Sequence, residues 1–304
     1  MTAHDSRTES QKAAQSNQQE AQQKQIDLVR DRFTRTAAAF ADFALTDRAG
    51  EAEHLLNLIA PSGNEHALDV ACGPGTLARI FAPHVQWIGG LDFTPAMLER
   101  ARKDAIANRL DNFRALRGNA LGMPFRDAAF DIVVTSYSIH HLPDPVAAIR
   151  EVARILKPGG KFGLLDMVVP EDAPRAAACN HIEWVRDPSH TRALPLSEFE
   201  RLLTSCGLRV VERGTEDHPR SLDVWMRTAG WKRGDTVYED VRRLLEASIP
   251  GDTAGFRPKI LAPPSPKEIA AGGDLRPDME LLHTAAFIIA QKQWPKNNDG
   301  ERIL

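Results

Sequence analysis

The chain contains 304 residues, of which 42% are hydrophobic and 26% charged, and its formal net charge is -3 at pH 7. This length allows one large domain or two small ones. The small negative charge argues against nucleic acid or an anionic membrane surface as the main partner, and no apolar stretch approaches the ~20 residues of a membrane span. Cys72, Cys179 and Cys206 are too far apart for a disulfide framework or a zinc site, so we expect a cytoplasmic protein.

Residues 1–25 are polar and rich in glutamine. They bury too little apolar surface to offset the entropy of ordering, so we predict a disordered tail or a frayed helix. From Ile26 to Phe43, apolar side chains recur every three or four residues, which predicts an amphipathic helix with a break near Ala39. A second helix is predicted over residues 50–59, before the Pro61-Ser-Gly63 turn.

Residues 66–167 alternate between short apolar runs and amphipathic segments. The runs predict strands near 66–71, 86–91, 113–117, 130–136 and 161–167. The amphipathic segments predict helices near 76–82, 94–107 and 144–156, the second of which has Thr94 as its expected N-cap and Pro95 in its first position. Such alternation favours a parallel sheet with helices on both faces.

The last third of the chain is less regular. Helices are predicted at 173–185, 197–206, 221–229 and 235–247, and strands at 208–212 and 283–291. Ser197 and Glu200 have the spacing of a capping box at the start of the second of these helices. The stretch from Pro250 to Pro277 is rich in proline and glycine. We interpret it as a surface excursion of one domain, because only one predicted strand follows it.

A glycine-rich turn, Cys72–Gly75, connects the first strand to the first of its helices. A tight turn of this kind lets the backbone approach a nucleotide closely and offer it unpaired N–H groups. Asp69 lies inside the preceding strand, where a purely structural strand would favour Val or Ile. The second strand ends in Asp92, about twenty residues after the glycines, where a carboxylate can accept from a ribose hydroxyl pair. Together these features predict a site for a nucleoside cofactor.

Four stretches of the chain are similar to class I S-adenosyl-L-methionine (SAM)-dependent methyltransferases, and most similar to the type that acts in ubiquinone and menaquinone biosynthesis. They are Leu68–Gly75, Gly90–Met97, Gly118–Phe125 with Phe130–Val134, and Arg154–Gly160. The stretches occur in the order and at the spacing of that family.

The resemblance implies an α/β fold with a Rossmann-like, seven-stranded sheet that is mostly parallel, with an antiparallel last strand and helices on both faces. It implies one methyltransferase domain over 26–292, followed by a tail over 293–304. Within that domain we expect cap helices at 26–60, a cofactor-binding core at 66–167, and a helical region at 173–250 that shapes the acceptor pocket.

The resemblance also assigns contacts to the cofactor. The aspartate of the first strand and the glycines of the turn would lie at its amino-acid part. The residues after the second strand would lie at its ribose and adenine, and those after the third strand at the adenine edge. The end of the fourth strand would lie beside the acceptor. The residues are Asp69, Gly73, Gly75, Asp92, Phe93, Asn119, Ala120 and Ser136.

His140 and His141 follow the fourth strand and are the candidate catalytic residues. A neutral imidazole there can remove a proton from the acceptor. Their rings are adjacent in sequence and should point apart, so we expect no metal site. The pair replaces the Arg-Asn of quinone methylases, and Pro74 stands where those often have Thr, which argues against a quinone acceptor.

Several further side chains are candidates to line the acceptor pocket. The segment Arg186–His190 resembles a cover over the acceptor in some relatives. The candidates in or near this segment are His181, Trp184, Arg186 and His190. The aromatic and apolar candidates are Phe33, Phe40, Trp184, Trp225, Met226 and Trp231. The second set implies an apolar or aromatic acceptor.

The expected function is therefore SAM-dependent methyl transfer to an O, N or C atom of a small apolar or aromatic metabolite. Two alternatives stay open. Gly73-x-Gly75-x-x-Ala78 also fits the dinucleotide fingerprint of a nicotinamide-dependent oxidoreductase, which binding of NADH would reveal. A SAM-binding assembly protein without catalytic activity would bind the cofactor and show no turnover. Apart from a small-molecule acceptor we expect no nucleic-acid partner and no membrane span, and a homodimer is left open.

Overall fold

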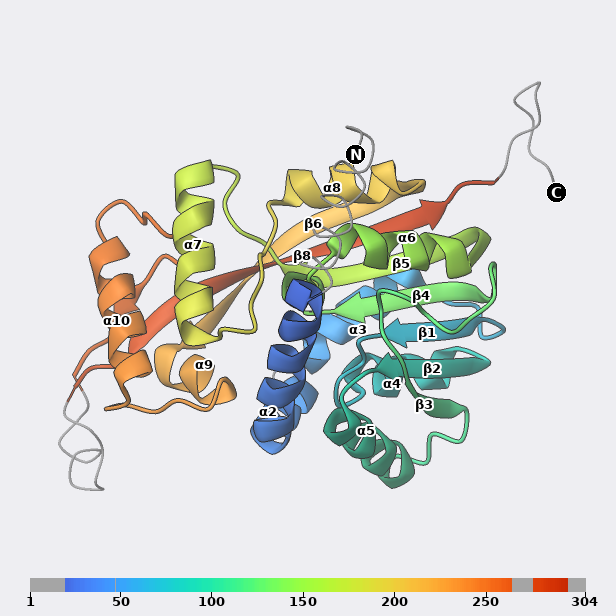
Figure 1. Ribbon diagram of the computed structural model, residues 1–304, viewed down its shortest axis with the longest axis horizontal. Coiled ribbons are helices and arrows are strands. Elements are labelled where there is room, and N and C mark those ends of the chain that lie inside the picture. The colour runs from blue at the N-terminus through green and yellow to red at the C-terminus, as the bar shows by residue number, and fades with distance from the viewer. Residues whose placement is uncertain (1–19, 47, 264–275, 295–304) are drawn as a thin grey trace, which may run out of the picture.

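The computed structural model describes residues 20–46, 48–263 and 276–294, and within these ranges the strands form one sheet (Figure 1). The strands are β1 (His66–Val70), β2 (Trp87–Asp92), β3 (Phe113–Arg117), β4 (Phe130–Ser136), β5 (Leu156–Met167), β6 (Leu208–Ser221), β7 (Lys259–Ile260) and β8 (Met279–Lys292). Their order is β3-β2-β1-β4-β5-β8-β6, with β7 paired to β8. β1 to β5 pair in parallel, and β8 is antiparallel to β5 and β6.

A helix over residues 20–35 leads into the domain, and we call it the lead-in helix. The helices after it are α2 (Ala37–Thr46), α3 (Ala49–Ile59), α4 (Thr76–Phe81), α5 (Pro95–Ala107), α6 (Pro145–Ile155), α7 (Ala173–Arg186), α8 (Leu196–Ser205), α9 (Leu222–Thr228) and α10 (Thr236–Ser248). Two 3-10 turns, η1 (Ala82–His84) and η2 (Ile139–His141), complete the set. No helix in the described ranges combines the length and the apolar character that crossing a membrane requires.

Successive residues of the central strands pack into different cores. In β4, Ile132 and Val134 belong to the cluster that includes side chains of α3 and α4, whereas Val133 belongs to the cluster that includes α6 and α8. Because side chains alternate along a strand, a sheet with helices on both faces buries every position of its central strands. The predicted fold class, a mostly parallel sheet with an antiparallel last strand between two helical layers, is confirmed.

The last two long strands exceed their predicted bounds. β6 covers 14 residues where the sequence predicts five, and it pairs with β8 along most of its length. Its second half carries charged side chains and Pro219, which are poor strand formers. Pairing with the apolar β8 overrides that preference, and Pro219 is tolerated because β6 is an edge strand.

The two predicted helix N-caps have different outcomes. Pro195, not Ser197, is the N-cap of α8, and Ser197 lies inside the helix, where its N–H and hydroxyl donate to Glu171 at 3.0 and 2.6 Å. The capping-box prediction is therefore wrong, because a more distant carboxylate takes those donors. Thr94 does occupy the N-cap of α5, but its side chain makes no cap bond.

The N-terminal prediction differs from the structure in its boundaries. Residues 20–25, assigned to the tail, are helical, and the helix turns at Thr36 instead of near Ala39. Gln25 explains the earlier start, because its side-chain amide donates to the carbonyl of Ser189 at 2.6 Å and so fixes this part of the helix. Residues 1–19 and 295–304, which make up most of the two predicted tails, and 264–275 of the proline-rich stretch lie outside the described residues.

Candidate active site

The glycine turn joins β1 to α4 with a backbone that few side chains tolerate. Gly75, the N-cap of α4, has φ 91°, and a Cβ there would lie 3.2 Å from the Cβ of Ala101 in α5. Gly73 has φ 52°, and its N–H donates to the Oδ2 of Asp92 at 2.9 Å. Glycine is therefore required at the second position both for its backbone angle and for helix packing.

Asp92 ends β2 and holds the turns on either side of it. Besides the bond from Gly73, its Oδ1 accepts the N–H of Thr94 at 2.8 Å. Burial raises the pKa of Asp92, and these two N–H groups oppose that rise. Each carboxylate oxygen retains a free lone pair for a ligand hydroxyl.

Two adjoining hollows meet at Asp92. The first, which we call the cofactor cavity after the predicted site, spans about 640 Å³, and a slot of about 410 Å³ lies beside it; both volumes include space open to solvent. Of the residues predicted to contact the cofactor, those in the cavity wall are Gly73, Asp92, Phe93 and Ser136. Those in the slot wall are Asp92, Phe93, Asn119 and Ala120. The Oδ1 of Asn119 accepts the N–H of Leu121 at 3.0 Å, which fixes the side chain in its own turn.

Asp69 and Gly75 line neither hollow. Asp69 is 1% exposed, and neither of its carboxylate oxygens has a hydrogen-bond partner among the described residues. Burial raises its pKa well above the ordinary range, opposed by the nearby amide of Ala78 and reinforced by the charge of Asp92. Asp69 is therefore a buried carboxyl two residues before the glycine turn, and its predicted contact with the cofactor is not seen in the walls of the two hollows.

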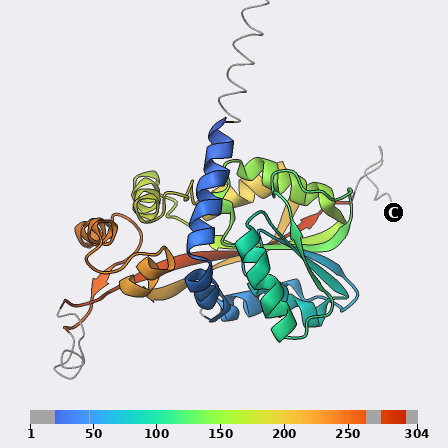
Figure 2. The ribbon, with the colours of Figure 1, turned by 60° about the horizontal axis from the view of Figure 1, so that its bottom comes forward.

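The lead-in helix and α2 cover the cofactor cavity. Val29, Phe33 and Phe40 are in its wall, and Phe33 meets the ring of His141 edge to face at 5.3 Å. In Figure 2 the lead-in helix, in blue, stands across the molecule beside the sheet. Apolar spacing alone predicted this helix, and the structure places it against the predicted site.

His140 is held by a carboxylate that the sequence analysis missed. Its Nδ1 lies 2.5 Å from the Oδ1 of Asp166, a fully buried residue of β5. Asp166 also accepts the N–H groups of Ile139 and Met167, each at 2.8 Å. The Nε2 of His140 has no hydrogen-bond partner within the described ranges. Asp166 interrupts an apolar strand as Asp69 does, so the criterion that singled out Asp69 would have found it.

His141 faces the cofactor cavity directly. Its Nδ1 lies 3.0 Å from the carbonyl oxygen of Ser189, so Nδ1 carries the proton and Nε2 remains an acceptor. Burial, followed by the neighbouring His140, lowers the pKa of His141 to about 3, which keeps the ring neutral. The rings of His140 and His141 are only 4.3 Å apart, so the expectation that they point apart is wrong. No group of three or more metal-binding side chains occurs in the described residues.

Beyond the histidines lies a second space, which we call the polar chamber. It consists of two hollows of about 390 and 370 Å³. The residues common to both are Arg48, Tyr137, His140, Glu183, Arg186 and Thr228. His190 and Trp225 each line one of them.

Only some of the residues predicted to line the acceptor pocket lie in the wall of this chamber. Arg186 and His190 reach it, whereas Trp184 is 54% exposed, stacks on His181 and lines none of the hollows described here. Met226 and Trp231 pack in the core instead. The sequence analysis missed Arg48, Tyr137 and Glu183, since nothing in their local sequence distinguishes them from ordinary helix and loop residues.

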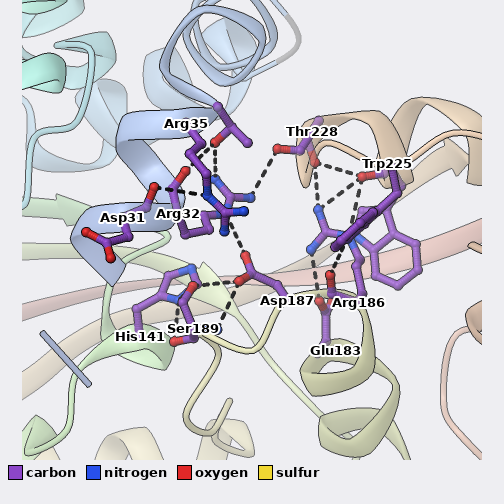
Figure 3. A network of polar contacts seen from close by, with 12 residues as sticks. Asp31, Arg32, Arg35, His141, Glu183, Arg186, Asp187, Ser189, Trp225 and Thr228 are labelled. Carbon is purple, nitrogen blue, oxygen red and sulfur yellow. Dashed lines mark hydrogen bonds and ion pairs between the residues drawn. The ribbon is translucent and has the colours of Figure 1, made fainter. Parts of the chain in front are cut away.

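A buried ion pair fastens the lead-in helix over this chamber (Figure 3). The Nε of Arg32 donates to the Oδ2 of Asp187 at 2.7 Å, and both side chains are almost fully buried. Arg32 also donates to the carbonyl of Thr228 at 3.1 Å, while Ser189 donates to Asp187 through its N–H and hydroxyl. The guanidinium of Arg32 thus joins three segments that are far apart in the sequence.

Comparison with known proteins agrees with this arrangement. A family described as "Methyltransferase domain" matches residues 68–164. The "Uncharacterized methyltransferase YcgJ" of Bacillus subtilis is 37% identical over 182 residues, 60% of this chain and 72% of that protein. Its crystal structure superposes with a TM-score of 0.72 at 28% identity, covering 81% of this chain and all of that one.

Two further relatives have more specific names. An "O-methyltransferase" of Pyrenophora dematioidea is 34% identical over 65% of this chain and 74% of that protein. A "Demethylmenaquinone methyltransferase" of Lactiplantibacillus plantarum is 35% identical over 36% of this chain and 48% of that protein. The family match over residues 68–164 covers the glycine turn, Asp92 and the strands around them, and the fold is that of YcgJ. The chain therefore belongs to the family of class I SAM-dependent methyltransferases.

Proposed function

We propose that the protein transfers the methyl group of SAM to an O, N or C atom of a small molecule bound in the polar chamber. The observation that carries this proposal is a shared wall. Arg48, Tyr137 and His141 line both the cofactor cavity and the first hollow of the polar chamber. A cofactor on one side and an acceptor on the other are thereby held side by side, which is the main requirement of a transfer that depends on positioning.

The residues around the cofactor cavity fit SAM. The free lone pairs of Asp92 match a ribose hydroxyl pair, and the slot beside it, with Leu91, Phe93 and Leu142 in its wall, suits an adenine. A Cβ added at Gly73 would have no other atom closer than 4.0 Å, so a ligand can approach the backbone there. When bound, the cofactor supplies an electrophilic methyl group on a sulfonium.

His140 is the base in this proposal. Its Nδ1 is occupied by Asp166, which orients the ring and stabilises the imidazolium that forms when Nε2 accepts a proton. His141 is a poor base because burial lowers its pKa to about 3, so its role is to line the cavity and offer a polar contact. The aromatic rings of Phe33, Phe40 and Tyr137 near the transfer point support an acceptor whose reacting end is apolar or aromatic.

The test is calorimetric titration with S-adenosylhomocysteine, with NADH titrated in parallel. We expect binding of S-adenosylhomocysteine alone, and in Asp92→Ala an affinity lower by about 10- to 100-fold, since charge-assisted hydrogen bonds contribute roughly 1.5–3 kcal/mol. The exposed Asp111→Ala serves as the matched control and should bind as the wild type does. Binding of NADH in place of S-adenosylhomocysteine, or full affinity in Asp92→Ala, would refute the assignment.

A further inference from the structure

Several cationic side chains line the polar chamber. Its wall holds Arg32, Arg48, Arg186 and Arg220. Three of them have a carboxylate partner: Arg32 pairs with Asp187 at 2.7 Å, Arg186 with Glu183 at 3.2 Å and Arg220 with Glu51 at 3.1 Å. In each of these three pairs, an acidic side chain balances the charge of the arginine.

Arg48 has no such partner. Within the described part of the chain, its guanidinium makes no hydrogen bond and no ion pair, and its Nε is buried without a partner. The group lies over the ring of Tyr137, 3.5 Å from the centroid, with Phe43 at 5.2 Å. Burial lowers the pKa of Arg48, which reflects the cost of desolvating a cation. After burial, the nearby carboxylates of Glu51 and Asp166 oppose this lowering, but neither forms an ion pair with Arg48 among the described residues. A buried cation on an aromatic wall without an ion-pair partner is typical of a site for an anion.

Other polar atoms around Arg48 also lack partners. Among the described residues, the hydroxyl of Tyr137 and the Nε2 of His283 are buried without a hydrogen-bond partner, and both residues line the 370 Å³ hollow. The Oε2 of Glu51 also lacks a partner within the described chain, and burial and then the nearby Glu51 raise the pKa of the Tyr137 hydroxyl. The pKa of His283 is well below its ordinary value because of burial and, after burial, because of Arg220, Arg186, Arg48 and His218, all of them basic. Arg48, Arg186 and Arg220 line this hollow beside a single carboxylate, that of Glu183, so the lining carries a net positive charge. The hydroxyl of Tyr137 can donate to a bound oxyanion.

Tyr137 has a backbone that fits a binding role. Its φ is 49°, in the left-handed region, immediately after β4. A non-glycine residue there is strained, and such strain persists where the surroundings hold the side chain in place. The backbone thus directs the Tyr137 ring against Arg48, between the cofactor cavity and the polar chamber.

We propose that the methyl acceptor carries an acidic group, a carboxylate in the first instance, which binds Arg48 in the hollow bounded by Arg186 and Arg220. The inference rests on the proposed function and names the substrate class of the same site. The anchored acceptor points its other end past His140 to the cofactor cavity. The acceptor is thus an acid with an apolar or aromatic body, in place of the wholly apolar molecule that the sequence suggested.

Arg48 also borders the cofactor cavity, so the carboxylate of the cofactor itself is the competing source of the same chemistry. The two sources can be separated. If Arg48 binds the acidic group of the acceptor, the affinity for the cofactor does not depend on Arg48. If Arg48 binds the carboxylate of the cofactor, that affinity does depend on it. Benzoate and benzamide are suitable probes, since they share a shape and differ in charge.

The experiment is titration of the protein with benzoate and, separately, benzamide, after saturation with S-adenosylhomocysteine. We expect benzoate to bind at least about tenfold more tightly than benzamide, as bidentate charge-assisted contacts allow. Arg48→Gln should abolish that preference and leave the affinity for S-adenosylhomocysteine within about twofold of the wild type. Arg48→Lys, which keeps the charge, should retain part of it, and the exposed Arg243→Gln should retain all of it.

Each contrary outcome has a distinct meaning. Equal binding of benzoate and benzamide, with normal binding of S-adenosylhomocysteine, overturns the acidic acceptor and leaves the methyltransferase proposal intact. A loss of S-adenosylhomocysteine affinity in Arg48→Gln, with the benzoate preference unchanged, assigns Arg48 to the cofactor and also overturns the inference. Failure of the wild type to bind S-adenosylhomocysteine refutes the proposed function itself. Thermal melting of each variant shows whether it is folded, and Arg48→Lys replaces Arg48→Gln if the latter unfolds.

Discussion

At the carboxyl edge of the sheet, single residues adopt backbone angles that cost energy unless they are glycine. Ala71 and Tyr137 have φ of 55° and 49°, directly after β1 and β4, and both line the cofactor cavity. A left-handed conformation at a residue with a Cβ costs about 1–2 kcal/mol. Gly75 takes φ 91° without that cost, which makes it the residue where a small change is most informative.

We expect Gly75→Ala to lower the free energy of unfolding by about 1–2 kcal/mol and to weaken binding of S-adenosylhomocysteine. The alanine must adopt a left-handed backbone, and its methyl group would lie only 3.2 Å from the Cβ of Ala101. Gly122→Ala is the control, because a Cβ there meets no atom within 4 Å and its φ is not positive. Urea denaturation compares the two, and equal stability of both variants would contradict this account of the turn.

Gly73, Asp92, Phe93 and Ser136 could be predicted to lie in the cavity wall because their positions depend on local order: a strand end, a turn and a short spacing. Arg48 and Tyr137 could not be found this way. Their environment is created by α7, α9 and β6, all of which begin more than 35 residues further along the chain than Tyr137 itself. An arginine before a helix has no local feature that reveals whether a carboxylate will lie beside it in the fold.

Among the elements, the lead-in helix depends most on distant contacts. Its polar anchors are the bonds of Gln25 to Ser189 and of Arg32 to Asp187 and Thr228. Desolvation favours the neutral form of Asp187, but Arg32, Arg186 and the hydroxyl of Ser189 outweigh it, so the pKa of Asp187 lies well below its usual range. The pair therefore stays ionised when buried, and removing one member leaves an uncompensated charge.

We predict that Arg32→Gln lowers the free energy of unfolding by about 3–5 kcal/mol, the usual cost of breaking a buried ion pair from one side. Backbone amides of the lead-in helix should also exchange faster with solvent. The control, Arg35→Gln, lies one turn further on the same helix and is exposed, so its effect should stay below about 1 kcal/mol. If the two variants exchange alike, the ion pair does not fasten the helix.

The elements from β1 to β5 were predictable because each consists of a short apolar run followed by an amphipathic segment, patterns that a local window captures. β6 was predicted only in its first part. Residues Arg213 to Ser221 become a strand through pairing with β8, which lies about seventy residues further along the chain. The Ser197 cap failed for the same reason, since Glu171 bonds it across the fold.

For the molecule as a whole, buried neutral histidines make stability depend on pH. Burial, then His140 and His141, lowers the pKa of His190 to about 2, and the pKa of His141 is about 3, against an ordinary value of 6.5. Between those limits the unfolded chain binds more protons than the folded one. Stability contributed by these residues is therefore present above about pH 6.5 and decreases as the pH falls.

We expect the wild type to lose about 1.4 kcal/mol more of its unfolding free energy than His190→Gln does between about pH 7.5 and about pH 5.5. Glutamine does not titrate, so the difference between the two proteins isolates the histidine from the buried carboxylates, whose raised pKa values act in the opposite direction. His181→Gln changes an exposed ring and should follow the wild type. Parallel pH dependence of His190→Gln and the wild type would show that His190 is not buried neutral.

The place of β8 in the sheet affects how the molecule is made. It is the last of the described strands in the chain, but it lies between β5 and β6. During synthesis, β6 leaves the ribosome before the only long strand that it pairs with exists, and its backbone N–H and C=O groups wait without ladder partners. A chain interrupted before residue 279 does not merely lack an edge. It leaves β6 detached from β5 and exposes the free side of β5, and quality-control proteases and chaperones recognise such unfinished sheets.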